Sequence, residues 1–151
     1  MPSPNRTRQI ARHESGRTTI KAITHDPATT LTAADSGKVI VIDKSGGTAA
    51  ITLPVAEVGL TYRIMVWKSD SGGSDNVTIA TAATTSLFKG GLVHLDTTAD
   101  ENSVGVEADF SDDDLVTLVA ARNGTFVELF CDGTHWYLTG RVVGGTVPTI
   151  G

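Results

Sequence analysis

The stretch TLTAADSGKVIVIDKSGGTAAITLPVAEVGLTYRI, residues 30–64, decides the fold. Three apolar runs begin in it, at residues 39–42, 51–53 and 62–66, and they are separated by turns rich in Gly, Ser and Asp. Short β-branched runs bounded in this way are typical of antiparallel strands joined by tight connections. The stretch therefore predicts a β-rich fold, and nothing in it resembles a catalytic motif.

The same pattern continues on both sides of this stretch. Apolar runs recur with turn signals about every 8 to 12 residues, and no segment has a convincing helical period. We therefore predict an all-β chain whose body is an antiparallel β-sandwich, jelly-roll-like, of about nine or ten short strands. Aromatic residues make up only 5% of the chain, so we expect a thin core of small residues that gains from burying surface between subunits.

Several Gly-containing pairs mark the predicted turns. Residues 45–47 are expected to close a hairpin, and the Asn-Gly pair at 123–124 a second hairpin of type I′. The Asp-Gly pair at 132–133 predicts the turn before the last strand. The Gly-Gly pair at 90–91 predicts a bulge or a turn within its strand.

The two faces of the longest predicted strand, residues 60–68, differ in character. Because side chains alternate along a strand, Tyr62, Ile64 and Val66 should share one face. The opposite face then carries Arg63, Met65 and Trp67. At least one of the two tryptophans, Trp67 and Trp136, is expected in the core.

Length and charge suggest one domain with extended ends. A chain of 151 residues can bury a core without metals or disulfides. With a single cysteine, Cys131, it has no intrachain disulfide, which fits a reducing cytosol or a particle assembled there. We divide it into a basic N-terminal arm (1–22), an all-β domain (23–143) and an extended tail (144–151). We find neither a secretion signal nor an apolar span, so we expect a soluble chain that enters no membrane.

Charge is distributed unevenly along the chain. Residues 1–22 have a net charge of +4, from five basic residues and Glu14, so the net −5 of the whole chain leaves −9 for the remainder. A basic arm on an acidic body suggests docking on an acidic surface or on nucleic acid. The acidic body argues against duplex binding, and we expect no nucleic-acid partner. The candidate anchoring residues are Arg6, Arg8, Arg12 and Arg17.

Two groups of residues are candidate sites of chemistry. Cys131, Asp132 and His135 suggest a nucleophile with its base, but they flank one turn, whereas such groups normally converge from separate elements. The Asp-rich segment 109–114 suggests a cation loop but lacks spaced ligands. We therefore expect no enzyme activity, no cofactor and no metal site, and whether that loop binds a cation stays open.

Three short motifs carry a resemblance to a known class of proteins. They are ITLP at 51–54, GLTYRI at 59–64 and DGTHWYLTG at 132–140. A strand that ends in Leu-Pro, a Gly before an aromatic strand and a terminal D-G-x-x-W segment resemble the β-rich structural proteins of tailed bacteriophages. The likeness is to capsid decoration (cement) proteins and related head or tail modules, and it spans residues 30–140.

The resemblance implies a role that needs no active site. It implies a homotrimer on the outer surface of an icosahedral phage head that binds the major capsid protein and bridges neighbouring subunits. The protein would be made in the host cytoplasm and reside on the virion. The alternative is a tail or head fibre module that adheres to a host receptor. A sugar-binding or enzymatic jelly roll is the third reading, and it would require aromatics and carboxylates gathered on one face.

Overall fold

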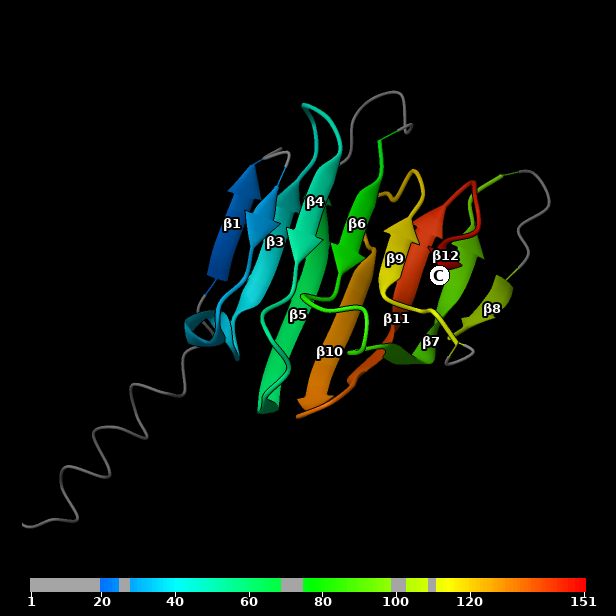
Figure 1. Cartoon of the computed structure of the whole chain (residues 1–151). Helices are drawn as coiled ribbons and strands as arrows, with labels where there is room; N and C mark the ends of the chain where they lie inside the picture. The colour runs from blue at the N-terminus through cyan, green and yellow to red at the C-terminus, as the bar shows by residue number, and fades with distance from the viewer. Residues whose placement is uncertain (1–19, 25–27, 69–74, 99–102, 109–110) are drawn as a thin grey trace, which may run out of the picture.

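The computed structural model describes residues 20–24, 28–68, 75–98, 103–108 and 111–151. Within these ranges the chain forms twelve strands and one 3₁₀ turn, and the strands belong to two sheets (Figure 1). The larger sheet has seven strands in the order β1-β3-β5-β10-β11-β7-β8, and the smaller has five in the order β12-β9-β6-β4-β2. The predicted all-β class is confirmed.

The seven strands of the larger sheet are β1 (Ile20–Thr24), β3 (Val39–Asp43), β5 (Val58–Lys68), β7 (Phe88–Asp96), β8 (Ser103–Glu107), β10 (Phe126–Asp132) and β11 (Trp136–Gly144). The five strands of the smaller sheet are β2 (Thr29–Thr30), β4 (Ala49–Thr52), β6 (Val77–Ala80), β9 (Leu115–Leu118) and β12 (Thr149–Ile150). The 3₁₀ turn η1 (Ala33–Asp35) lies between β2 and β3.

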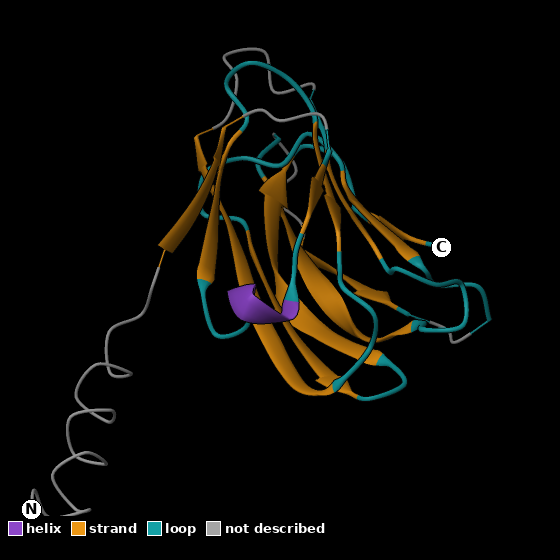
Figure 2. Cartoon of the chain, turned by 60° about the vertical axis from the view of Figure 1, so that its left-hand side comes forward, coloured by secondary structure: helices purple, strands orange, loops and turns teal. Residues whose placement is uncertain are grey.

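The two sheets pack face to face as a sandwich (Figure 2). Inward side chains of both sheets form one core, from Ile40, Ile42 and Ile64 of the larger sheet to Ile79 and Leu118 of the smaller one. Trp136 is completely buried in this core, whereas Trp67 is 70% exposed. The prediction of at least one core tryptophan is therefore confirmed, as are the two predicted faces of β5, because Tyr62, Ile64 and Val66 are buried.

Strand pairing is mixed rather than purely antiparallel. From β1 to β6 the chain enters the larger and smaller sheets alternately, and the strands β1, β3 and β5 pair in parallel, as do β2, β4 and β6. Antiparallel pairing appears where β10 lies between β5 and β11. From β1 to β6 the chain thus winds back and forth between the two sheets and adds one parallel strand to each in turn. The strands that follow complete both sheets.

Two predicted hairpins are wrong for this reason. The turn at 45–47 leads from β3 in the larger sheet to β4 in the smaller one, and the Asn-Gly turn at 123–124 lies between β9 and β10, which also belong to different sheets. Each turn reverses the chain across the sandwich instead of within one sheet. The turn at 132–133 does close a hairpin, in which Cys131 pairs with Trp136.

Both ends of the described chain take part in the sheets. β1 begins at Ile20 and pairs with β3, so residues 20–22 of the assigned arm belong to the larger sheet. In the tail, Thr149 and Ile150 pair with Thr117 and Val116 of β9. The tail therefore adds a strand to the five-stranded sheet of its own chain.

The Gly-Gly pair at 90–91 lies inside the continuous strand β7. Gly90 has a φ of +107°, and a Cβ built on it would lie 2.3 Å from the carbonyl oxygen of Leu138 on β11. Only glycine lets the two backbones approach this closely. Gly90 therefore sets the contact of β7 with β11, Gly91 sets its contact with Val106 of β8, and the pair does not form a turn.

Candidate binding surfaces

The predicted capsid-binding residues Arg6, Arg8, Arg12 and Arg17 lie outside the residues that the structure describes. Their role stays a prediction. Within the described ranges no helix has the length and apolar character needed to cross a membrane.

The residues Cys131, Asp132 and His135 form a structural turn. Oδ1 of Asp132 accepts hydrogen bonds from the backbone N–H groups of Thr134 (2.8 Å) and His135 (2.7 Å), and these bonds lower the pKa of Asp132. Cys131 is buried, and its Sγ accepts a hydrogen bond from the N–H of Gly133. The carboxylate thus holds its own turn, and it does not orient the imidazole of His135 toward the thiol.

The described part of the acidic segment 109–114 connects the two sheets. The carbonyl of Asp113 accepts the N–H of Phe88, and the carbonyl of Asp114 accepts the N–H of Thr81. Asp109 lies outside the described ranges. In the part of the chain that can be examined, no three His, Cys, Asp or Glu side chains are grouped so as to hold a metal ion.

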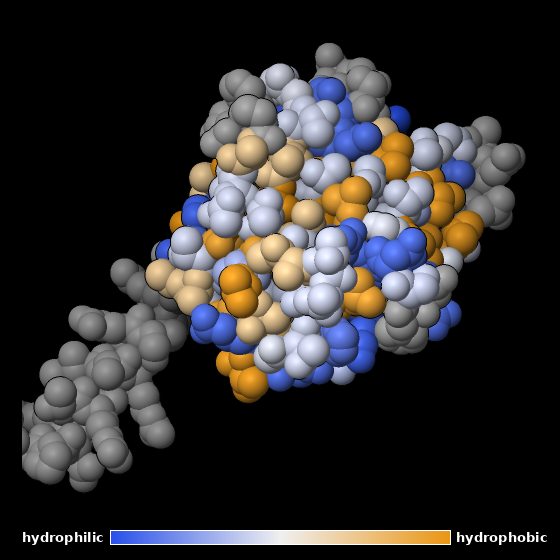
Figure 3. Space-filling model, in the orientation of Figure 1, coloured by the Kyte–Doolittle hydropathy of each residue, from blue (hydrophilic) through white to orange (hydrophobic). Residues whose placement is uncertain are grey.

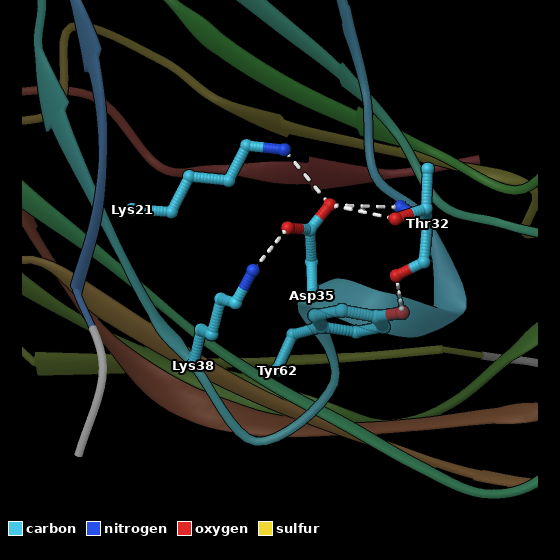
Figure 4. Close-up of polar contacts among 5 residues, drawn as sticks. All are labelled: Lys21, Thr32, Asp35, Lys38 and Tyr62. Carbon is cyan, nitrogen blue, oxygen red and sulfur yellow. Dashed lines mark hydrogen bonds and ion pairs between the residues drawn. The ribbon is translucent and has the colours of Figure 1, made fainter. Parts of the chain in front are cut away.

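A charged cluster lies at the end of the sandwich near η1 (Figure 4). Asp35 binds Nζ of Lys21 and Nζ of Lys38, each at 2.8 Å, although its side chain is only 8% exposed. The backbone N–H and the hydroxyl of Thr32 donate to the same carboxylate. Lys21 and then Lys38 make the largest contributions to a pKa of Asp35 well below its usual range.

Tyr62 connects this cluster to the core. Its hydroxyl donates to the carbonyl of Thr32 at 2.9 Å, and its ring lies 5.8 Å from that of Trp136 (Figure 4). Burial, followed by the charge of Asp35, raises the pKa of Tyr62 to about 12. Because the carboxylate already has four partners, the cluster fastens β1 and the β2–β3 connection together and offers no vacant ligand position.

The outer face of the seven-stranded sheet carries a group of aromatic and charged side chains, which we call the aromatic face. Phe130 and Tyr137 stack with ring centroids 4.8 Å apart at 7°. The guanidinium groups of Arg63 and Arg141 lie 5.3 and 5.5 Å from the ring centre of Phe126. Such cation–π contacts at exposed sites contribute about 0.5–1 kcal/mol each.

Polar contacts accompany these rings. Nε of Arg63 binds Oε1 of Glu128 at 3.2 Å, and both side chains are about half exposed. The hydroxyl of Tyr137 donates to Oδ2 of Asp132 at 3.1 Å, which raises the pKa of Tyr137. This face therefore combines apolar rings with hydrogen-bonding groups, and such a combination suits recognition of another molecule.

The outer face of the five-stranded sheet, which we call the threonine face, is different. Its outward positions alternate with buried ones along β4, β6 and β9. At these described positions there is no charged side chain, and the residues are Thr30, Ala50, Thr52, Thr78, Ala80, Leu115, Thr117 and Thr149. Figure 3 shows this side of the molecule, where pale residues of intermediate hydropathy predominate across the middle.

The aromatic face was not predicted from the sequence. A sugar-binding surface would require aromatics gathered on one face, and three of the few aromatic rings do lie together on β10 and β11. A signal was available, because the correctly predicted turn at 132–133 pairs Phe130 with Tyr137 and Phe126 with Arg141. The contribution of Arg63 required knowing that β5 lies on the other side of β10.

Comparison with known proteins gives no family for this chain. A scan against models of protein families finds no match, and a search among curated proteins finds no similar sequence.

Proposed function

We propose that the chain is a structural protein of a tailed-phage virion, a capsid decoration protein that binds the outside of the head as a homotrimer. The observation that carries the proposal is the threonine face, an uncharged surface whose outward residues suit contact with further copies of the chain. The motif resemblance supports the virion context. The proposed partners are the major capsid protein and two more copies of this chain.

The motif residues themselves support the fold more than the function. Leu53 of the ITLP motif is completely buried, and Tyr62 of the second motif packs against Trp136 of the third. Gly133 of the third motif lies against Val58, where an added Cβ would meet the valine side chain at 2.7 Å. Residues that build a core identify an architecture, so the function is argued from the surfaces.

The threonine face has the properties of a contact between identical copies. Two rows of paired residues run across the strands, each over four of the five, and one of them joins Ala50, Thr78, Thr117 and Thr149 in register. Small side chains let three such faces approach a common axis, and hydroxyls donate or accept across the contact. Burying a charged side chain in a contact costs several kcal/mol for removing the ion from water. Because the threonine face has no charged side chain, its burial carries no such cost.

The basic arm supplies the second contact. The residues before β1, 1–19, have a net charge of +3, because four arginines outnumber Glu14. This charge complements an acidic capsid surface, and each trimer presents three arms. Three linked contacts increase avidity by about 10²–10⁴ over one contact when all three engage together. Because such a clamp binds only the assembled lattice, it stabilises the head by mass action.

Cosedimentation with undecorated phage heads tests this proposal. The whole chain should pellet with heads at a saturable ratio, and a variant lacking residues 1–17 should remain folded and trimeric but stay in the supernatant. That deletion ends before β1, which begins at Ile20. Normal binding by the truncated chain would contradict the role of Arg6, Arg8, Arg12 and Arg17, and failure of the whole chain to bind heads would contradict the decoration role.

A further inference from the structure

Two shallow depressions cross the aromatic face and meet at Thr139. The first, about 470 Å³, lies over β3, β5 and β10, and its lining includes Thr61, Arg63, Glu128 and Phe130. The second, about 440 Å³, lies over β11, β7 and β8, where glycines leave the surface low. Thr139 lines both, so together they form one groove that runs across the strands.

The floor of this groove is one row of paired residues. Arg63 is opposite Glu128, Glu128 is opposite Thr139, Thr139 is opposite Gly91, and Gly91 is opposite Glu107. Five strands spaced about 4.8 Å apart make the row about 19 Å long. The floor therefore offers donors, acceptors and a hydroxyl in sequence, and it has bare backbone where Gly91 carries no side chain.

Aromatic rings border the floor on both sides along the strands. On one side Phe130 and Tyr137 stand two residues from Glu128 and Thr139, and on the other Phe126 stands two residues from Glu128. One side of the Phe130 ring stacks on Tyr137, but its other cross-strand neighbour is Thr61, which is too small to cover the opposite side. Phe130 accordingly remains 51% exposed beside the first depression.

We propose that this groove binds an oligosaccharide, with one pyranose ring against Phe130 and its hydroxyls on Arg63, Glu128 and Thr139. A pyranose has an apolar face of C–H groups and a rim of hydroxyls that both donate and accept. It therefore requires a flat apolar surface beside donors and acceptors. Phe130 supplies the surface, Arg63 donates, Glu128 accepts, and the threonine hydroxyl does both.

The floor carries one cation, Arg63, and two carboxylates, Glu128 and Glu107, so it disfavours an anionic glycan. Beside Phe130 the two charges are paired, which favours a neutral glycan there. Arg63 and Glu128 offset each other at 3.2 Å, and this contact uses only Nε of the arginine and Oε1 of the glutamate. The terminal guanidinium nitrogens and Oε2 are outside that contact. An extended peptide fits less well, because peptides that add to a sheet do so at an edge, and β5, β10 and β11 are interior strands.

This inference does not rest on the decoration role, since the groove and the threonine face lie on different sheets. A virion protein with such a groove would hold the particle near glycans of a cell surface. Adhesion to a host receptor is the role of the alternative, a tail or head fibre module. We assign such adhesion to the groove, which is one surface of the proposed decoration protein.

A microarray of bacterial surface polysaccharides and neutral oligosaccharides, probed with the full chain, tests the groove. The wild type should bind at least one neutral glycan, and Phe130→Ala should reduce its affinity at least tenfold in a solution titration with that glycan. The matched control is Trp67→Ala, which removes an exposed aromatic ring outside the groove and should leave affinity unchanged.

A second variant separates loss of the ring from loss of hydrogen bonds. Arg63→Gln keeps a hydrogen-bond donor but removes the positive charge and the several N–H donors of the guanidinium group. It should therefore weaken glycan binding less than Phe130→Ala does. Binding of no glycan on the array, or equal binding by wild type and Phe130→Ala, would overturn the proposal. Phe130→Ala should still pellet with phage heads, and this readout separates failure of the groove from failure of the decoration role.

Discussion

The two outer faces of the sandwich are built by the same strand alternation, yet they differ in almost every chemical respect. The aromatic face carries stacked rings, cations over rings and an ion pair. The threonine face carries small uncharged residues in two rows. Inward positions on both sheets are apolar, because the side chains of both pack into one hydrophobic core. The shared core constrains only the inward positions, so the outward positions are free to differ and determine what each sheet can contact.

The largest expected effect comes from the core that both faces share. Trp136 is completely buried and contacts Tyr62, so Trp136→Ala removes a large side chain from between the sheets. We expect a loss of about 3–5 kcal/mol in the free energy of unfolding. Chemical denaturation measures it. A loss below about 1 kcal/mol would mean that the sheets do not depend on one common core.

Substitution of one glycine should strain the contact between β7 and β11. Gly90→Ala forces a side chain into a positive φ and against the carbonyl of Leu138, and we expect a cost of about 2–4 kcal/mol. The matched control is Gly105→Ala on β8, where an added Cβ meets nothing within 4 Å. Thermal unfolding of the two variants checks this, and equal midpoints would contradict the close approach of β7 and β11.

A smaller effect is expected where the charged cluster joins the edges of the two sheets. Asp35→Asn removes the anion between Lys21 and Lys38, and we expect a loss of about 1–3 kcal/mol near neutral pH, because both lysines are about 30% exposed and solvent screens the pairs. Urea unfolding of wild type and variant measures the difference.

The pH dependence of that difference has a definite sign. The folded pKa of Asp35 lies below the unfolded value of about 3.9, so its stabilisation is complete above that value and is lost as pH falls toward the folded pKa. The gap in stability between wild type and Asp35→Asn should therefore narrow from about pH 5 to about pH 2. A gap that widens on acidification would show that another group is responsible.

Prediction from sequence succeeded where a signal was local. The faces of β5 follow from strict alternation, and the hairpin at 132–133 follows from an Asp-Gly pair between two β runs. Which strands pair with one another could not be predicted from local sequence. The turns at 45–47 and 123–124 have the residues typical of hairpin turns, but at both places the chain crosses from one sheet to the other. Alternating apolar residues satisfy either arrangement, because a strand buries one face whichever sheet it joins.

The candidate surfaces show the same limit. Lys21 reaches Asp35 only because β1 pairs in parallel with β3, and no sequence motif indicates this pairing. The threonine face also emerged only when β2, β4, β6, β9 and β12 were known to be neighbours, since each contributes one or two small residues.

The most direct test of the account is the solution mass of the protein and of one variant in the middle of the threonine face. Light scattering should give about three times 15.8 kDa for the wild type and a monomer for Thr78→Arg, because an arginine there would be buried without a partner. The matched control Thr84→Arg, in the exposed connection between β6 and β7, should remain trimeric. A monomeric wild type, or a Thr78→Arg variant that stays trimeric, would contradict the assignment of this face to self-association.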